Sequence, residues 1–246
     1  MNYTKTRKRY DIKYYELNSK YSLKESMFML FLQDAATENA EVNGFGYSWC
    51  EANNYGWFLL KYRIELNQYP TNKMEYIEIE TESRGTSKLF AFRDFTIYTP
   101  NNNIIGRATS CWGLIDMKAK TMIPPQKANP NFEIFTKRED DLLYNKIILS
   151  NEFDFKKNFE VRFDDLDVNQ HANNSNYISW ALEALPYDFR INHMIKNIDI
   201  HIKKDISVGE FVITKAKINN ELNQTLHLVK NKETKDDLAL LCIDWA

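Results

Sequence analysis

The sequence is poor in the residues that break regular structure. It has only 7 glycines and 6 prolines among 246 residues, which argues against collagen-like and disordered low-complexity sequence. Hydrophobic residues make up 43% of the chain and charged residues 27%, the composition of an ordinary soluble globular protein. A chain of this length can bury a core without cross-links, either as one large domain or as two small ones.

The chain also has few cysteines, a small net charge and no long apolar run. The three cysteines, Cys50, Cys111 and Cys242, are far apart and show no metal-binding spacing, so we expect free thiols in a reducing cytoplasm and no metal or other cofactor. With a net charge of −2 the chain has no overall positive potential that would favour the binding of nucleic acid. The longest apolar run, residues 27–32, is too short to span a bilayer. The N-terminal residues lack the apolar stretch of a secretory signal.

A repeat runs through the chain. Residues 10–18, YDIKYYELN, match residues 159–167, FEVRFDDLD, at a constant offset of 149 residues. In this alignment aromatic residues match aromatic ones, and acidic, β-branched and basic residues match residues of the same class. Both copies alternate apolar and charged residues, which is the period of a half-buried strand. Chance similarity of two strand-helix segments is the alternative to a duplication.

Each copy is followed by a helical pattern and then by runs typical of strands. In the first copy Ser22 and Glu25 have the form of a capping box, and Gly44 offers a helix stop. In the second, Asn173 or Asn174 can cap the helix, and Pro186 ends it. Strands are expected at residues 57–66, 76–83, 89–98, 104–116, 195–203, 210–218, 224–230 and 238–245, with turn signals between them, Gly85 included.

The repeating unit is therefore a strand, a long helix and about four further strands. A long helix on one face of an antiparallel sheet is a stable two-layer arrangement, so the expected fold class is α+β. We place the first unit at residues 1–125, a linker containing the charged cluster KREDD at residues 126–150, and the second unit at residues 151–246.

The two copies differ where the strand meets the helix. The second copy carries Asn169 and His171 there, and the first carries Lys20 and Ser22. A helix start favours developing negative charge, an Asn amide can donate to an oxyanion, and a His can move a proton near neutral pH. The same residue types are also common in loops and helix caps that have no catalytic role. No serine-hydrolase elbow, paired metal-ligand pattern or phosphate-binding loop offers another site.

The stretch DLDVNQHANN, residues 165–174, closely resembles the plant and bacterial acyl-acyl carrier protein (acyl-ACP) thioesterase family. The resemblance extends over roughly residues 8–245 and includes several first-half segments in the family's order: QDAA at 33–36, GFG at 44–46, RD at 93–94 and ATSCW at 108–112. It implies two tandem hot-dog units, of which the first holds the acyl chain and the second supplies the catalytic groups. It also implies hydrolysis of the thioester between a fatty acyl chain and the carrier protein's phosphopantetheine, as part of fatty acid biosynthesis.

The resemblance carries the family's catalytic Asp, Asn and His onto Asp167, Asn169 and His171. A further acid of the family falls on Asp205, in the triplet Lys203-Lys204-Asp205. Family members often have the longer Glu at that position. Plant members often have Cys at the next position, where this chain has Ile206, so no cysteine nucleophile is expected there.

The acyl chain needs an apolar pocket, for which the first helix and the loop after it provide candidates. The candidate substrate contacts are Met27, Leu30, Phe31, Phe45, Trp49, Asn173 and Asn174. A stripe of Met and aromatic residues is also ordinary core. The expected partner is the acidic acyl carrier protein, with the basic run of residues 5–9 as a candidate docking surface or simply a solvated strand start. A homodimer is left open by the sequence, and so are an acyl-CoA thioesterase and a non-catalytic acyl-binding protein.

Overall fold

The first unit contains a strand, a long helix, a short helix and a run of four long strands. The elements in chain order are β1 (Thr6–Asp11), the 3-10 turn η1 (Tyr14–Glu16), α1 (Glu25–Val42), α2 (Tyr47–Asn53), β2 (Tyr55–Leu66), β3 (Tyr76–Ser87), β4 (Phe90–Tyr98), β5 (Ile104–Asp116), β6 (Thr121–Ile123) and α3 (Pro125–Ala128).

The second unit repeats this plan in a shorter form. Its elements are β7 (Phe155–Glu160), the 3-10 turn η2 (Phe163–Asp165), α4 (Asn174–Leu182), α5 (Tyr187–Asn192), β8 (Ile195–Ile202), β9 (Phe211–Asn219), β10 (Gln224–Asn231) and β11 (Asp237–Trp245).

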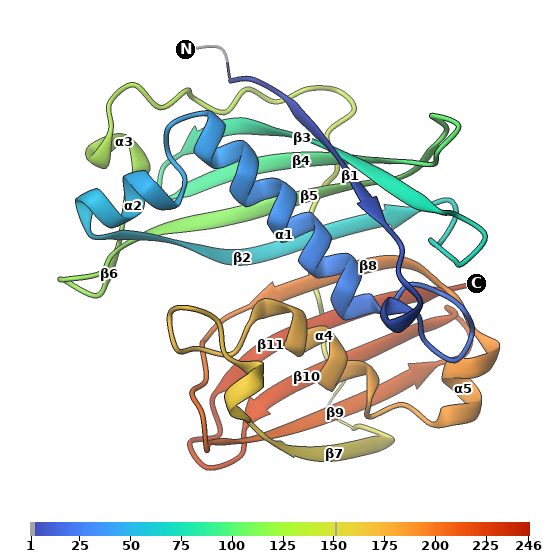
Figure 1. Ribbon diagram of the computed structural model, residues 1–246. Helices are drawn as coiled ribbons and strands as arrows, with labels where there is room; N and C mark the ends of the chain where they lie inside the picture. Colours follow the sequence, from blue (N-terminus) through green and yellow to red (C-terminus); the bar gives the residue numbers. More distant parts are fainter. Residues whose placement is uncertain (1–2, 151) are drawn as a thin grey trace.

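The computed structural model describes residues 3–150 and 152–246, and the described strands form one continuous antiparallel sheet (Figure 1). The strand order is β1-β3-β4-β5-β2-β8-β11-β10-β9-β7, and β6 pairs with β5. Read from the two edges inward, the halves have matching orders, so two half-sheets meet edge to edge at β2 and β8. This is the expected α+β arrangement of two hot-dog units, each with a helix packed on an antiparallel sheet. Residues 1, 2 and 151 lie outside the described residues, and they include residues 1 and 151, the predicted first residues of the two units.

The structure repeats with the offset that the sequence predicts. Strands β1 and β7, turns η1 and η2, and the starts of α1 and α4 are each separated by 149 residues. The equivalence extends to backbone angles, because Tyr21 and Gln170, at matching positions, both have positive φ values of 58° and 64°. The long helices α1 and α4 pack against each other across the molecule (Figure 1).

The seam between the half-sheets contains a buried ion pair. Arg63 of β2 and Asp199 of β8 are register partners, and Arg63 Nη1 lies 2.5 Å from Asp199 Oδ2. Both side chains are buried, and Asn145 of the linker donates to the same carboxylate through its side-chain amide at 3.0 Å. Breaking one member of such a pair is strongly destabilising because the other is left buried and unpaired.

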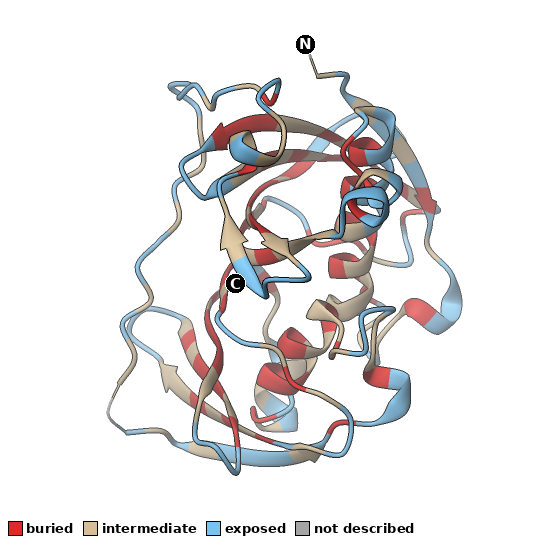
Figure 2. Ribbon diagram, turned by 90° about the vertical axis from the view of Figure 1, so that its left-hand side faces the viewer, coloured by how far each residue is buried: buried red, intermediate tan, exposed pale blue. Residues whose placement is uncertain are grey.

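The segment predicted as a linker crosses the sheet on the face opposite α1. Arg93 contacts Asn39 of α1, whereas its neighbour Asp94 lies on the other face and pairs with Arg84. Arg84 also pairs with Asp141 of the linker at 2.6 Å. Charged residues of the KREDD cluster thus form ion pairs with the outer face of the first unit. Figure 2 shows this connection descending from the first unit to the second.

The predicted capping box at Ser22 is wrong. Helix α1 begins at Glu25 after the N-cap residue Lys24, and no side chain caps it. Ser22 is buried and forms a bridge with Thr71. The chain is therefore still extended at Ser22 because its backbone is held by pairing with the segment after β2. In the second unit the prediction is confirmed, since Asn173 accepts from the amide of Ser175 at 2.9 Å.

The prediction of a turn at Gly85 is also wrong, because Gly85 lies inside β3. The register of β3 with β4 shifts between Ser83 and Gly85, which marks a bulge. Gly85 has φ +87°, and a Cβ there would lie 2.8 Å from the carbonyl oxygen of Glu133. Gly85 is thus required both by the backbone conformation of the bulge and by the close approach of the linker. None of the helices in the described chain is long and apolar enough to cross a membrane.

A buried histidine of the second unit makes the stability of the fold depend on pH. His227 of β10 is fully buried, and its Nε2 is hydrogen-bonded to Thr225 Oγ1 at 2.8 Å. Burial lowers the pKa of His227 to about 4, with a smaller opposing effect from the backbone of Ala181. In the unfolded chain the imidazole takes up a proton near pH 6.5.

We therefore expect the free energy of unfolding to fall as the pH drops from 6.5 towards 4, with His227 contributing up to about 3 kcal/mol of the loss. Urea unfolding at pH 7 and pH 4.5 measures this change. In His227→Gln the fall between the two pH values should be smaller than in the wild type. An equal fall in both proteins would show that His227 does not carry the effect.

Candidate functional site

The loop between η2 and α4 is held in shape by the Asp167 side chain. Asp167 Oδ1 accepts from the backbone amides of Asn169 at 2.8 Å and His171 at 3.4 Å. The Asp167 amide donates to the carbonyl of His171 at 2.7 Å. Asp167 therefore orients Asn169 and His171 through their backbone, and it does not need to touch their side chains. In the first unit Asn18 makes the equivalent hydrogen bonds.

The structure places His171 next to Asp205. His171 Nδ1 lies 3.6 Å from Asp205 Oδ2, which is ion-pair distance but longer than a hydrogen bond. His171 Nδ1 is buried and has no hydrogen-bond partner within the described chain. Burial raises the pKa of the Asp205 carboxyl; His171 opposes this effect and Asp167 adds to it. A carboxylate with a raised pKa is a stronger base than an ordinary aspartate.

Asp205 is positioned by hydrogen bonds from α4 and from the loop before it. The buried hydroxyl of Tyr177 donates to the carbonyl of Lys204 at 3.0 Å, and the amide of Ala172 donates to the carbonyl of Ile206 at 2.9 Å. These two bonds bracket Asp205 in sequence. The side chain of Lys204 turns away to pair with Asp236 at 2.8 Å. Tyr177 could not be singled out from the sequence, because it falls among the buried residues of α4.

Most amides at the start of α4 are already engaged. The amide of Asn173 donates to Asp165, and the amides of Ser175 and Asn176 both donate to Asn173. The stabilisation of negative charge that was expected at this helix start is therefore left to the amide of Asn174, the first residue of the helix. The side chain of Asn173 is used as the helix cap.

A cavity of about 540 Å³ lies in the first unit and reaches the loop of the second. It is bordered by the C-terminal half of α1, by α2 and by strands β2 to β5, and it reaches Val168 and Asn169 at one side. Phe58 of β2 lines it and contacts the ring of His171, with 6.4 Å between ring centroids. Its other lining residues include Ala36, Ala40, Phe45, Cys50, Trp57, Arg93 and Trp112.

Only one of the predicted substrate contacts lines this cavity, namely Phe45. Met27, Leu30 and Phe31 lie on the N-terminal half of α1, and Phe31 is buried in the core, stacked on Tyr10. Trp49 packs on Phe132 at the edge of the cavity. The space lies instead against Ala36 and Ala40. Small residues four apart on one helix face were the signal that could have indicated it.

The equivalent junction of the first unit lacks this chemistry. Lys20, at the position of Asn169, donates to the carbonyls of Arg190 and His193 at the end of α5. Ser22 stands at the position of His171. Tyr69 precedes Pro70, whose carbonyl accepts from Leu23 as that of Ile206 does from Ala172, so Tyr69 occupies the place of Asp205.

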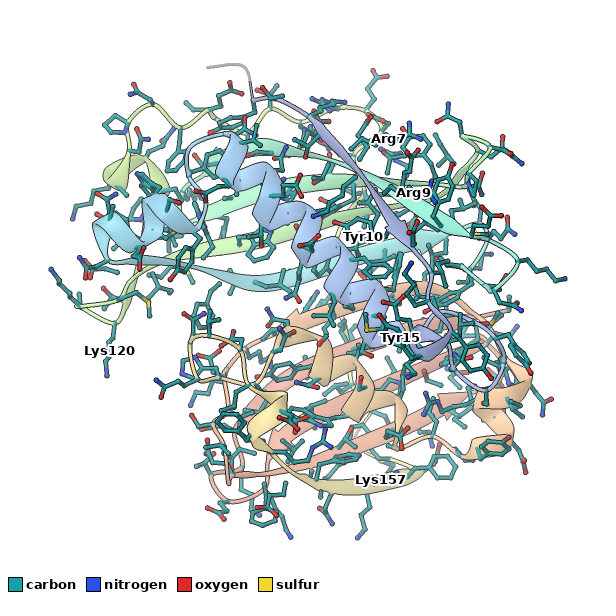
Figure 3. All side chains as sticks on the ribbon, in the orientation of Figure 1. Arg7, Arg9, Tyr10, Tyr15, Lys120 and Lys157 are labelled. Atoms are coloured by element: carbon teal, nitrogen blue, oxygen red, sulfur yellow. The ribbon has the colours of Figure 1, made fainter. Side chains whose placement is uncertain are left out.

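The cysteines and the basic run do not add to the site. Burial raises the pKa of Cys50 to about 12, of Cys111 to about 11 and of Cys242 to about 12, so these thiols stay protonated near neutral pH. No group of three His, Cys, Asp or Glu side chains in residues 3–150 and 152–246 is arranged to hold a metal. Figure 3 shows Arg7 and Arg9 on the edge strand β1, well away from the 166–173 loop. They pair with Glu78 and Asp11, as expected for a solvated strand start.

Comparisons with known proteins agree with this division into two units. The family model described as the acyl-ACP thioesterase N-terminal domain matches residues 3–126, and the acyl-ACP thioesterase C-terminal domain matches residues 149–246. A chloroplastic acyl-ACP hydrolase of Cuphea viscosissima is 24% identical over 94% of this chain and 59% of its own length. A chloroplastic palmitoyl-acyl carrier protein thioesterase of Cuphea hookeriana is 28% identical over 73% of this chain and 46% of its own. The chain thus spans about half the length of these curated relatives.

Solved structures share the whole fold at low identity. An acyl-ACP thioesterase from Bacteroides thetaiotaomicron superposes with a TM-score of 0.84 at 18% identity, covering 98% of both chains. The 12:0-ACP thioesterase from Umbellularia californica superposes with a TM-score of 0.80 at 19% identity, covering 98% of this chain and 97% of its own. With both domain models matched in order along one chain of this fold, the protein belongs to the acyl-ACP thioesterase family.

Proposed function

We propose that this protein hydrolyses the thioester between a fatty acyl chain and the acyl carrier protein, releasing free fatty acid and the carrier protein with its free phosphopantetheine thiol. The observation that carries the proposal is the cavity, which is largely lined by apolar side chains and ends at Asn169, next to the pair formed by His171 and Asp205. Family membership supports the choice of acyl-ACP as substrate.

The arrangement supports direct attack by water. With the acyl chain in the cavity, the thioester carbonyl lies by Asn169 and His171, which donate hydrogen bonds to its oxygen as charge develops. Asp205 takes a proton from water, the resulting hydroxide adds to the carbonyl carbon, and the carbon–sulfur bond breaks as the intermediate collapses. The departing sulfur takes up the proton that Asp205 received, which restores the carboxylate.

The three free cysteines are compatible with a reducing compartment, and on that basis we propose a cytoplasmic location. The chemistry needs no metal, because water activation is assigned to a carboxylate of raised pKa and polarisation of the carbonyl to Asn169 and His171.

Replacing His171 tests the reaction itself. His171→Ala should lower kcat with acyl-ACP by about a hundredfold to ten-thousandfold, because it removes a group that acts on the reacting carbonyl. Release of free fatty acid from purified acyl-ACP is the readout. His193→Ala, a change in a histidine at the end of α5, is the matched control and should retain wild-type turnover. Near-normal turnover in His171→Ala would refute the assignment, and equal efficiency with acyl-CoA would refute the choice of carrier.

Replacing Asp205 tests the base. A general base must be ionised, so kcat/KM should fall as the pH drops through the pKa of Asp205. Because burial raises this pKa, the fall should occur at a higher pH than for an ordinary aspartate. Asp205→Asn should lower kcat by about a hundredfold or more, whereas Asp205→Glu, which keeps the carboxylate, should retain much of it. Equal losses in both variants would argue against a base at this position.

Tyr177 acts as a positioning residue through the carbonyl of Lys204. Tyr177→Phe removes one hydrogen bond of about 1 kcal/mol, so kcat should fall about fivefold with little change in KM. Tyr187→Phe, at an exposed tyrosine of α5, is the control and should leave both constants unchanged. An unchanged kcat in Tyr177→Phe would show that this hydrogen bond does not position Asp205.

A further inference from the structure

The strand register identifies the side of the cavity that is remote from His171. Phe58 of β2, which contacts His171, pairs with Gly113 of β5. Gly113 pairs with Phe90 of β4, and Phe90 pairs with Ser87 of β3. Strand β3 is therefore three strand spacings, about 14 Å, away from β2. The cavity spans this distance, because residues of all four strands line it.

Two segments outside the strands close the cavity on the side of β3. The linker lies beside β3, where the amide of Thr86 donates to the carbonyl of Glu133 at 2.8 Å. Tyr3, in the segment before β1, lines the cavity, and its hydroxyl accepts from the amide of Glu133 at 3.0 Å. The next residue, Thr4, is bound to the end of α1, because its amide donates to Asn43 Oδ1 at 2.8 Å and its carbonyl accepts from Asn43 Nδ2 at 3.0 Å. Tyr3 is thus fixed between α1 and the linker at the far side of the cavity.

The ring of Tyr3 is fixed by aromatic packing as well as by its hydroxyl. It meets the ring of Phe45 edge to face with 5.2 Å between centroids, and Phe45 meets Phe132 of the linker in the same way at 5.5 Å. Edge-to-face pairs are a favourable arrangement of aromatic rings. Phe45 and Phe132 are buried, and Tyr3 is half-buried. A chain that is too long for the cavity must therefore displace a packed ring or leave methylene groups unburied.

We propose that Tyr3 sets the upper limit on the length of the acyl chain by closing the far side of the cavity. This inference rests on the proposed function in one respect, namely that the cavity holds the acyl chain with its thioester beside Asn169 and His171. At about 1.2 Å per bond of an extended chain, the distance from β2 to β3 corresponds to about 12 bonds. The ligand is therefore an acyl chain of medium length, about 12 to 14 carbons, whose methyl end contacts the ring of Tyr3.

The test measures kcat/KM for saturated acyl-ACPs of about 8 to 18 carbons, and each methylene beyond the limit should cost the wild type about tenfold. In Tyr3→Ala the limit should move to longer chains by about four carbons, because the phenol group is about as long as four bonds of the chain. Tyr3→Phe keeps the ring and should keep the wild-type limit, although it loses the hydrogen bond to Glu133. The matched control is Tyr14→Ala, at an exposed tyrosine of η1, which should also keep the limit. An unchanged limit in Tyr3→Ala, an equal shift in Tyr3→Phe, or a wild type without any limit in this range would overturn the proposal.

A binding measurement separates failure of this inference from failure of the proposed function. Trp57 and Trp112 line the cavity, so quenching of tryptophan fluorescence reports the binding of free fatty acids of the same lengths. The longest acid that binds tightly should be longer for Tyr3→Ala than for the wild type, whether or not any acyl-ACP is hydrolysed. If no acyl-ACP is hydrolysed but this shift occurs, the proposed reaction fails and the inference stands. The same length dependence in both proteins refutes the inference even where hydrolysis occurs.

A variant of the opposite sense keeps the proposal testable if Tyr3→Ala does not fold. Tyr3→Trp places a larger ring system at the same wall, so the limit on chain length in turnover should move to shorter chains. A limit that is unchanged in Tyr3→Trp, or that moves to longer chains, would overturn the proposal.

Discussion

The pairing of β2 with β8 is the contact on which the rest of the structure depends. It joins two half-sheets into one and contains the buried pair of Arg63 and Asp199. The cavity belongs to the first unit, whereas His171 and Asp205 belong to the second. Phe58, on β2, lines the cavity and contacts His171, so the distance between the cavity and the pair of His171 and Asp205 is set across this seam.

The two units share a backbone conformation at the loop before the long helix and differ in the side chains that this loop carries. Both have the same loop before the long helix, stabilised by Asn18 in one unit and by Asp167 in the other. In the second unit the loop presents Asn169 and His171. In the first unit the equivalent Lys20 instead binds carbonyls at the end of α5, which belongs to the second unit. One copy of the loop thus carries the proposed reacting groups, and the other contacts the second unit and helps to hold the units together.

Much of this organisation could be predicted from the sequence, because it depends on local periodicity. The offset of the repeat and the strand at Ile104–Asp116 were predicted as observed, since alternation and turn residues are local signals. Ser22 and Gly85 were misread because pairing with Thr71 and approach of the linker are long-range. Periodicity identifies the buried face of α1 but cannot tell which end of that face borders empty space, so Ala36 and Ala40 were missed. The candidate site residues were identified by resemblance to the family. That His171 and Asp205 lie next to each other could be seen only in the folded structure.

The seam also bears on why the two units occur in one chain. Each half-sheet alone would present β2 or β8 as a long unpaired edge, and such edges are templates for uncontrolled association. Tethering the halves makes their pairing intramolecular, with a high effective concentration of each edge for the other. The linker crosses the first half-sheet and contacts Asp199 at the seam through Asn145, so the covalent connection passes over the joint between the two half-sheets before it reaches β7. Fusion of the repeats therefore covers two edges that could associate with other molecules, and it also fixes the position of the cavity relative to His171 and Asp205.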